Sequence, residues 1–244
     1  MILYGRNAVH EALRGRRAAR VTDVWATAPA AREPWLHAAR PRIVPAEELE
    51  QRCGSAAHQG VCADAGPYDY VSGDELLQAR EPLIVVLDQI QDPQNLGSIC
   101  RTAECAGADG VVIPERRAAE VTSAVCKASA GAVEHLSIAR VRNIADFLAD
   151  ARRAGCWCYG ASAADPGLVR PPVAYDAPDY AGSGVALVLG SEGSGLRPRV
   201  AKACDELIAL PLLGRIESLG VSAAAAALLY EILQSRTARV DKSP

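Results

Sequence analysis

The chain has 244 residues, of which 50% are hydrophobic and 23% are charged, and its formal net charge is −3. This composition is typical of a globular protein large enough for two domains, and the slightly acidic balance excludes binding to nucleic acid through overall positive charge. No apolar run reaches the ~18 residues of a membrane span, and no cationic leader precedes an apolar block at the N-terminus. We therefore expect a cytoplasmic protein without membrane contact.

The eight cysteines are scattered, and the closest pair, Cys156 and Cys158, is too tightly spaced for a C-x-x-C metal site. This arrangement predicts neither a metal centre nor a disulfide framework. We expect the cysteines to be small buried apolar residues in a reducing compartment.

Residues 1–66 have the mixed pattern of a small α/β domain. Asn7 is suited to cap a first helix that ends near Gly15. The elements expected after it are a strand at 21–28, a helix at 32–40, a strand at 43–44, a helix that starts at Pro45 and a strand after residue 60. Residues 67–81 are polar and contain Gly and Pro, which predicts a linker to a second domain over residues 82–244.

The second domain alternates strands and helices. Residues 83–87 form a continuous apolar run, as in fully buried parallel strands. Further strands are expected at 110–113, 136–141, 156–161, 185–189 and 206–210, helices at 92–106, 121–132, 143–154, 196–204 and from 221 onward, and a loop at 165–179. The alternation predicts a parallel sheet covered on both faces, and such sheets bind ligands at the carboxyl ends of their strands.

Three loops of unusual composition follow strands of this sheet. The first, residues 88–101, has a turn at Asp92-Pro93, then Asn95, placed to cap a helix or to present its amide, and then Arg101. It is either a capped helix with a surface arginine or a site where the guanidinium recognises a phosphate-bearing substrate.

The second loop, residues 190–195, has the sequence GSEGSG, whose spacing differs from the dinucleotide and Walker phosphate-binding motifs. Glu192 at its centre disfavours a polyphosphate ligand, and a simple tight turn is the alternative. The third loop lies between Gly214 and Gly220, before an alanine-rich helix. Together the loops predict a site for a moderately sized ligand with a positive or zwitterionic part.

Three stretches, NLGSICRTAECAGADGVVIP, LVLGSEGSGL and IALPLLGRIESLGVSAAAAALLYE, resemble the three motifs of the SpoU (TrmH) family of RNA ribose 2′-O-methyltransferases, in the family's order and spacing. YGRNAVHEAL and HQGV near the N-terminus resemble the L30e-like domain of the branch that includes the 23S ribosomal RNA guanosine 2′-O-methyltransferase. The resemblance implies a SPOUT-type α/β sheet with a C-terminal trefoil knot and a small N-terminal L30e-like domain over residues 1–66.

The resemblance also implies roles for particular residues. S-adenosylmethionine would be bound by residues of the second and third loops, namely Leu189, Gly190, Leu210, Leu212, Ser218 and Leu219. Asn95, Arg101, Glu192 and Ser218 match the family's catalytic positions, with Arg101 at the ribose hydroxyl. Asn95 and Glu192 would orient Arg101 and the loops, and Ser218 would bond near the methionine end of the cofactor. In the family this arginine is the proposed general base. Because a guanidinium is ordinarily protonated, Arg101 would need a large local pKa shift to act as one, or it serves instead to hold an RNA phosphate and polarise the hydroxyl. Gly220 departs from the family, whose motif has Asn there.

The resemblance also implies that the partner is RNA and that the protein is a homodimer. Candidate RNA contacts in the first domain are His58, Gln59 and a cluster of arginines, Arg14, Arg16, Arg17 and Arg20. Charge alone leaves open whether this cluster is a solvated helix end or a phosphate-binding patch. The predicted reaction is methylation of a guanosine ribose in 23S ribosomal RNA. The alternatives are a transfer-RNA or resistance-type ribosomal RNA methyltransferase, or a non-catalytic RNA-binding or ribosome-assembly protein of the same fold.

Overall fold

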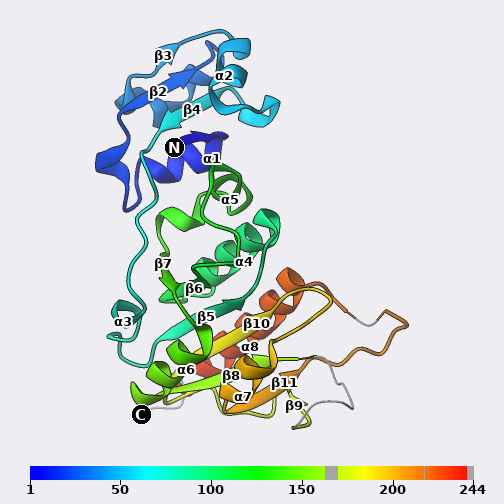
Figure 1. The fold of residues 1–244 in the computed structure, drawn as a ribbon. Helices are drawn as coiled ribbons and strands as arrows, with labels where there is room; N and C mark the ends of the chain where they lie inside the picture. The colour runs from blue at the N-terminus through cyan, green and yellow to red at the C-terminus, as the bar shows by residue number, and fades with distance from the viewer. Residues whose placement is uncertain (163–169, 217, 241–244) are drawn as a thin grey trace.

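The computed structural model describes residues 1–162, 170–216 and 218–240, and Figure 1 shows a small domain above a larger one. The small domain is built on a four-stranded sheet in the order β1-β4-β2-β3, in which β4 is antiparallel to both of its neighbours. Its elements are β1 (Ile2–Tyr4), α1 (Arg6–Ala12), η1 (Ala18–Arg20), β2 (Asp23–Ala26), η2 (Ala30–Arg32), η3 (Pro34–Ala39), β3 (Arg42–Ile43), α2 (Ala46–Cys53), η4 (Ala56–His58) and β4 (Val61–Asp64).

The first helix does not begin as predicted. It follows Gly5, whose φ is 94°, and no side chain caps it, so the expected cap at Asn7 is wrong. Instead, the backbone N–H of Arg6 donates to Oε1 of Gln59 over 3.0 Å. A partner that lies far along the chain thus satisfies a free N–H of this helix end. The helix expected at 32–40 is a 3₁₀-helix, η3.

The linker is packed against the large domain. It contains a short helix, α3 (Gly73–Leu76), whose start has Ser72 and Glu75 in a capping box. Upstream of it, the hydroxyl of Tyr68 donates to the carbonyls of Val133 (2.9 Å) and Leu136 (3.1 Å). These contacts fix the path of residues 67–81, although their polar composition predicted only a connection.

The large domain is a seven-stranded sheet in the order β7-β6-β5-β10-β8-β11-β9, and every neighbouring pair is parallel. Its elements are β5 (Leu83–Asp88), α4 (Pro93–Cys105), β6 (Gly110–Pro114), α5 (Ser123–Ala128), η5 (Ala132–Glu134), β7 (Ser137–Val141), α6 (Ile144–Arg153), β8 (Cys156–Ala161), β9 (Val173–Ala174), β10 (Gly184–Gly190), α7 (Pro198–Ala203), β11 (Glu206–Ala209) and α8 (Val221–Val240).

The predicted alternation of strands and helices is confirmed. Two details differ: the helix expected at 121–132 is split into α5 and η5, and β9 lies within the stretch expected to be a loop. Residues 165–169 of that stretch are outside the described residues. The trefoil knot stays a prediction.

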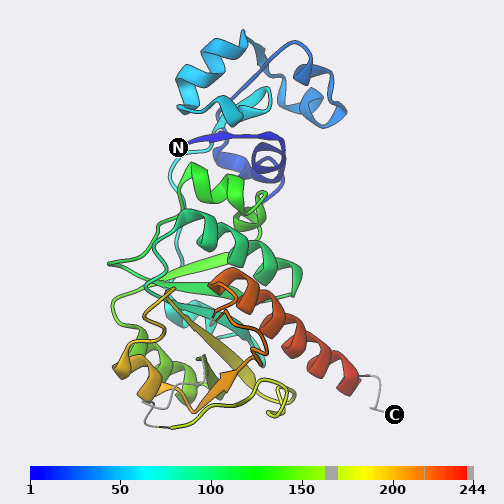
Figure 2. The ribbon, with the colours of Figure 1, turned by 90° about the vertical axis from the view of Figure 1, so that its right-hand side faces the viewer.

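Helices cover both faces of the large sheet, as Figures 1 and 2 show. Successive strand residues face opposite layers. Val85 and Leu187 belong to the core that includes α4, α5 and α8, whereas Val86 and Val188 belong to the core that includes α3, α6 and α7. Both faces being buried explains the continuous apolar runs of β5 and β10.

Six of the eight cysteines are buried and all eight are free thiols, which confirms their expected role as apolar core residues for those six. Burial raises the pKa of Cys100 to about 12.

Within the described part of the chain, no helix is long and apolar enough to cross a membrane. In the same residues, no group of three or more His, Cys, Asp or Glu side chains is placed to hold a metal ion.

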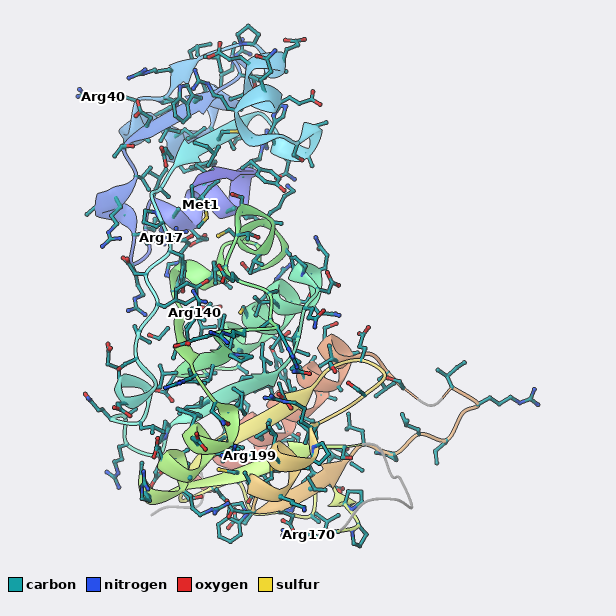
Figure 3. The ribbon with its side chains drawn as sticks, in the orientation of Figure 1. Met1, Arg17, Arg40, Arg140, Arg170 and Arg199 are labelled. Carbon is teal, nitrogen blue, oxygen red and sulfur yellow. The ribbon has the colours of Figure 1, made fainter. Side chains whose placement is uncertain are left out.

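A buried ion pair joins the two domains. Arg17 of the small domain is 2% exposed and Glu134 of the large domain 1% exposed, and Nε of Arg17 donates to Oε2 of Glu134 over 2.9 Å. Burial by itself lowers the pKa of Arg17, but the hydrogen bonds and charge of Glu134 outweigh burial and raise it. Figure 3 shows Arg17 at the junction between the blue and green parts of the chain. The pair fixes the small domain against the large one.

Arg17→Met should lower the free energy of unfolding by about 3–5 kcal/mol, because it leaves the Glu134 carboxylate buried without its partner. Urea denaturation measures the change. Arg20→Met is the matched control, because Arg20 and Asp69 form a pair that is half-exposed on both sides, and exposed pairs contribute about 1 kcal/mol or less. Equal losses in the two variants would contradict the role of the buried pair.

Candidate functional site

The first two loops and the start of α8 meet at the carboxyl ends of β5 and β10. They form a cavity of about 310 Å³ that is open to solvent on one side and is lined by Gln89, Ile90, Gln91, Asp92, Asn95, Ser191, Glu192, Ser194 and Val221. Its volume is at the lower end of the range of small-molecule sites. The sequence predicted a ligand site at this edge of the sheet, and the cavity lies there.

A hydrogen-bonded junction of Asn95, Glu192 and Ser222 closes one side of the cavity. Oε1 of Glu192 accepts from Nδ2 of Asn95 over 3.2 Å and from the backbone N–H of Val221 over 3.3 Å. The hydroxyl of Ser222 donates to Oδ1 of Asn95 over 3.1 Å. Both ends of the Asn95 amide are therefore engaged, and the first loop, the second loop and the start of α8 are tied together.

Local sequence explains why Asn95 is free to take part. Asp92 caps α4 by accepting from the backbone N–H of Gln94 over 3.0 Å, and Pro93 occupies the first turn of the helix. Of the two roles predicted for Asn95, the structure shows the presented amide. Glu192 lies at the start of α8, where the helix dipole favours a negative charge.

The glycines of the second loop allow a close turn. A Cβ on Gly190 would lie 2.2 Å from the carbonyl carbon of Gly195, so only glycine fits at position 190 without a shift of the backbone. Gly193 and Gly195 have φ values of 84° and 62°, in the left-handed region that favours glycine. The tight turn brings the backbone of this loop to the mouth of the cavity.

Asp88 is a residue of the site region that the prediction missed. It ends β5, is fully buried, and accepts from the backbone N–H and from Nε of Arg197 over 2.9 and 2.7 Å. These two hydrogen bonds tie the end of β5 to Arg197, in the segment after the second loop. A single acidic residue directly after a run of five apolar ones was the available signal.

The third loop extends away from the body of the domain, as the orange segment at the right of Figure 1 shows. Leu213 is 98% exposed and Ile216 77% exposed. Of the residues predicted to bind the cofactor, Leu212 and Leu219 are also exposed and do not line the cavity.

The other predicted cofactor residues lie at the bases of their loops. Leu189 is buried in the core, Gly190 ends β10, and Leu210 packs at the edge of the core. The hydroxyl of Ser218 accepts from the backbone N–H of Gly220 over 3.1 Å, next to the junction. Gly190 directly precedes Ser191 of the cavity lining, whereas Ser218 and the apolar residues of the third loop are not among the residues that line the cavity.

Arg101 lies apart from the junction. It is exposed on α4, and six residues at about 100° each place it roughly 120° around the helix from Asn95. In the described residues, no hydrogen bond joins Arg101 to Asn95 or Glu192, whose side chains bond to each other and to the start of α8, and the orientation of Arg101 by these two stays a prediction.

The small domain corrects two of the predicted RNA contacts. Arg17 is buried in the ion pair with Glu134 and has no surface to offer RNA. His58 is also buried, and its Nδ1 accepts from the backbone N–H of Gly60 over 3.0 Å. The remaining candidates are Arg14, Arg16, Arg20 and Gln59, and each has a partner within the chain, respectively Glu11, Ser137, Asp69 and the N–H of Arg6.

Comparisons with known proteins agree with this architecture. Residues 82–230 match the SpoU rRNA Methylase family, and residues 2–71 match the RNA 2′-O ribose methyltransferase substrate binding domain. A putative TrmH family tRNA/rRNA methyltransferase of Bacillus subtilis is 41% identical over 201 residues, which are 80% of this chain and 77% of that protein. An uncharacterized tRNA/rRNA methyltransferase of Synechocystis is 38% identical over 96% of this chain and 62% of its own length.

Solved structures show the same fold. An AdoMet-bound rRNA methyltransferase from Sinorhizobium meliloti superposes with a TM-score of 0.78 at 25% identity, covering 96% of this chain and 86% of that one. The SpoU methyltransferase AviRb from Streptomyces viridochromogenes, solved in complex with AdoMet, gives a TM-score of 0.75 at 23% identity, covering 98% and 91%.

The fold and the matches define a class of enzyme, the RNA ribose 2′-O-methyltransferases that use S-adenosylmethionine. The chain belongs to the SpoU rRNA methylase family. The polar part of the cavity suits this cofactor, because the carboxylates of Asp92 and Glu192 favour a cationic sulfonium and the loop glycines let a ligand approach the backbone.

Gly220→Asn should strengthen binding of S-adenosylmethionine about fivefold, the equivalent of one added hydrogen bond of ~1 kcal/mol. Gly220 has a φ of 78°, a conformation that Asn tolerates better than other side chains. Its Cβ would lie 3.5 Å from Oε1 of Glu192, in ordinary contact, and the new amide would reach the carboxylate. Titration calorimetry measures the affinity.

Gly214→Asn is the matched control for this substitution, because a Cβ on Gly214 meets no atom within 4 Å. Its affinity should equal that of the unsubstituted protein. A clear loss of affinity in Gly220→Asn would contradict the prediction and show that the site is adapted to glycine.

Proposed function

We propose that the enzyme methylates the ribose 2′-hydroxyl of a guanosine in 23S ribosomal RNA. The Asn95–Glu192–Ser222 junction carries the catalytic part of this proposal, because it joins the first loop, the second loop and the start of α8 at one cavity, although the motif Asn is replaced by Gly220. The ribosomal target is supported by the N-terminal domain, which matches a substrate-binding family and resembles the 23S-modifying branch. A transfer-RNA target is the second candidate, because the relatives' names include both RNA classes.

Bound S-adenosylmethionine supplies a methyl group on a positively charged sulfur. Charge is lost as the methyl leaves, so the protein's main tasks are to align the hydroxyl and to assist its deprotonation. Asn95 and Glu192 hold α4, the second loop and α8 in one relative position. A site whose groups are held in place before the substrate arrives has less reorganisation to undergo.

Arg101 is proposed to contact the RNA at the reacting ribose. Its guanidinium stays protonated, so it serves to hold a phosphate and polarise the 2′-hydroxyl. Its position on α4, away from the cavity of its own chain, is the reason to propose a homodimer in which each site receives Arg101 from the second copy. The exposed apolar side chains of Leu213 and Ile216 support such an assembly.

We also propose a cytoplasmic location, since all eight cysteines are free thiols.

The proposed target is tested by methyl transfer from tritiated S-adenosylmethionine to unmodified 23S ribosomal RNA and, separately, to transfer RNA, followed by mapping of the methylated ribose. We expect one guanosine of the ribosomal RNA to be labelled. Label in transfer RNA alone would contradict the ribosomal target, and cofactor binding without label in either RNA would favour a non-catalytic RNA-binding protein.

Arg101→Ala should reduce methyl transfer by about 10²-fold or more, as does removal of a group that stabilises the transition state, while S-adenosylmethionine binds as before. Mixing Arg101→Ala with Asn95→Ala protein tests the shared site. If each site takes Arg101 from the second copy, mixed dimers contain one intact site and regain activity. If mixing restores nothing although the chains exchange, the site lies within one chain.

A further inference from the structure

The loop between β6 and α5, residues 115–122, connects the cavity with the small domain. It leaves the carboxyl end of β6, and the backbone N–H of Ala119 donates over 2.8 Å to the carbonyl of Ile90, a cavity residue. Two residues on, the N–H of Val121 donates to the hydroxyl of Tyr70 in the linker over 2.8 Å. Directly after the loop, the hydroxyl of Ser123 donates to the carbonyl of Ile2 in β1 over 2.6 Å. The loop therefore runs from the methyl-transfer site to the substrate-binding domain.

Two adjacent arginines on this loop are unpaired. Arg116 and Arg117 are exposed, and in the ranges that the structure describes neither has an ion-pair or hydrogen-bond partner. Arginines of the small domain that were expected to bind RNA are engaged within the chain, whereas these two are free to bind a ligand.

The surroundings leave this loop positive. The carboxylate of Glu120 is neutralised by Arg140, 3.1 Å away, which leaves Glu115 as the remaining acidic side chain against two arginines. Figure 3 shows Arg140 below Arg17, on the part of the large domain next to the small one. Among the described residues, the large exposed apolar side chains all lie elsewhere, so the loop offers charge and no apolar contact.

Arg117 also has an unusual backbone. Its φ is 60°, in the left-handed region that costs a residue with a side chain about 1–2 kcal/mol. The hydrogen bonds of Ala119 and Val121 hold the loop in this shape. Strained conformations of this kind persist where the surrounding structure holds them, and they are frequent at binding sites.

We propose that Arg116 and Arg117 bind consecutive phosphates of the substrate RNA between the small domain and the methyl-transfer site. The proposal rests on the proposed function, since it concerns the RNA of that same reaction. A guanidinium presents a planar fork of donors that matches phosphate oxygens. The loop contacts both a cavity residue and β1 of the small domain, so an RNA strand that reaches from the small domain to the cavity would run past it. The two arginines would set how far along the strand the target ribose lies.

The test compares binding of unmodified 23S ribosomal RNA transcript to the full-length protein and to the double variant Arg116→Gln/Arg117→Gln. Losing two phosphate contacts should reduce the slope of log affinity against log salt concentration by about 1.5 and weaken binding at 0.1 M salt by about tenfold. Calorimetry with S-adenosylmethionine should show no change. The double variant Arg116→Lys/Arg117→Lys keeps the charge and should retain most of the affinity.

Arg80→Gln is the matched control, because Arg80 is exposed and unpaired in the described residues but precedes β5, at the opposite edge of the sheet. It should bind RNA with unchanged affinity and salt slope. Equal affinity of the Gln double variant and the unsubstituted protein would overturn the proposal, as would equal losses in the double variant and Arg80→Gln. Because affinity is measured without turnover, a protein that binds RNA but does not methylate it would refute the proposed reaction and still decide the role of the arginines. Arg117→Asn, which suits the left-handed backbone, checks that a loss comes from the missing charge and not from a changed loop.

Discussion

The site depends on one carboxylate oxygen. Oε1 of Glu192 accepts from the amide of Asn95 and from the first N–H of α8, and so joins three segments that are far apart in the chain. The parallel sheet brings the bases of these segments to one edge, but it does not determine how the segments contact one another beyond the strands. The hydrogen bonds to Glu192 determine that contact. The dipole of the 20-residue helix α8 favours the negative charge of Glu192 at its start.

The second constraint is the fixed position of the small domain. A buried pair such as Arg17 and Glu134 carries a large desolvation cost, which the two hydrogen bonds from Nε and Nη2 of Arg17 to the carboxylate offset, while Nη1 has no partner among the described residues. The linker adds to this, because Tyr68 is bonded to two carbonyls of the large domain. A substrate-binding domain held in this way presents RNA to the cavity from one direction. The loop after β6 lies between that domain and the cavity.

Elements defined by local pattern were predicted well, and those that depend on distant partners were not. The strand at 156–161 matches at both ends, and its start is marked in the sequence by the end of a helix followed by Gly155. The start of α1 was misjudged because Gln59, and not Asn7, supplies the bond at that helix end. The same limit applies to charge: Arg14 and Arg17 are three residues apart, yet one is exposed and the other is buried against Glu134.

The sequence by itself determined the two-domain order, the parallel α/β sheet, the edge where the site lies and the three motif loops, because apolar periodicity and glycine placement are local properties of the chain. It also determined the family, through motifs whose order and spacing are visible in one dimension. Only the tertiary structure decided that Asn95 presents its amide to Glu192, that Asp88 is buried against Arg197, and which arginines remain free. These outcomes depend on contacts between residues tens to more than a hundred positions apart, and a linear sequence does not show which distant partner a polar side chain will meet.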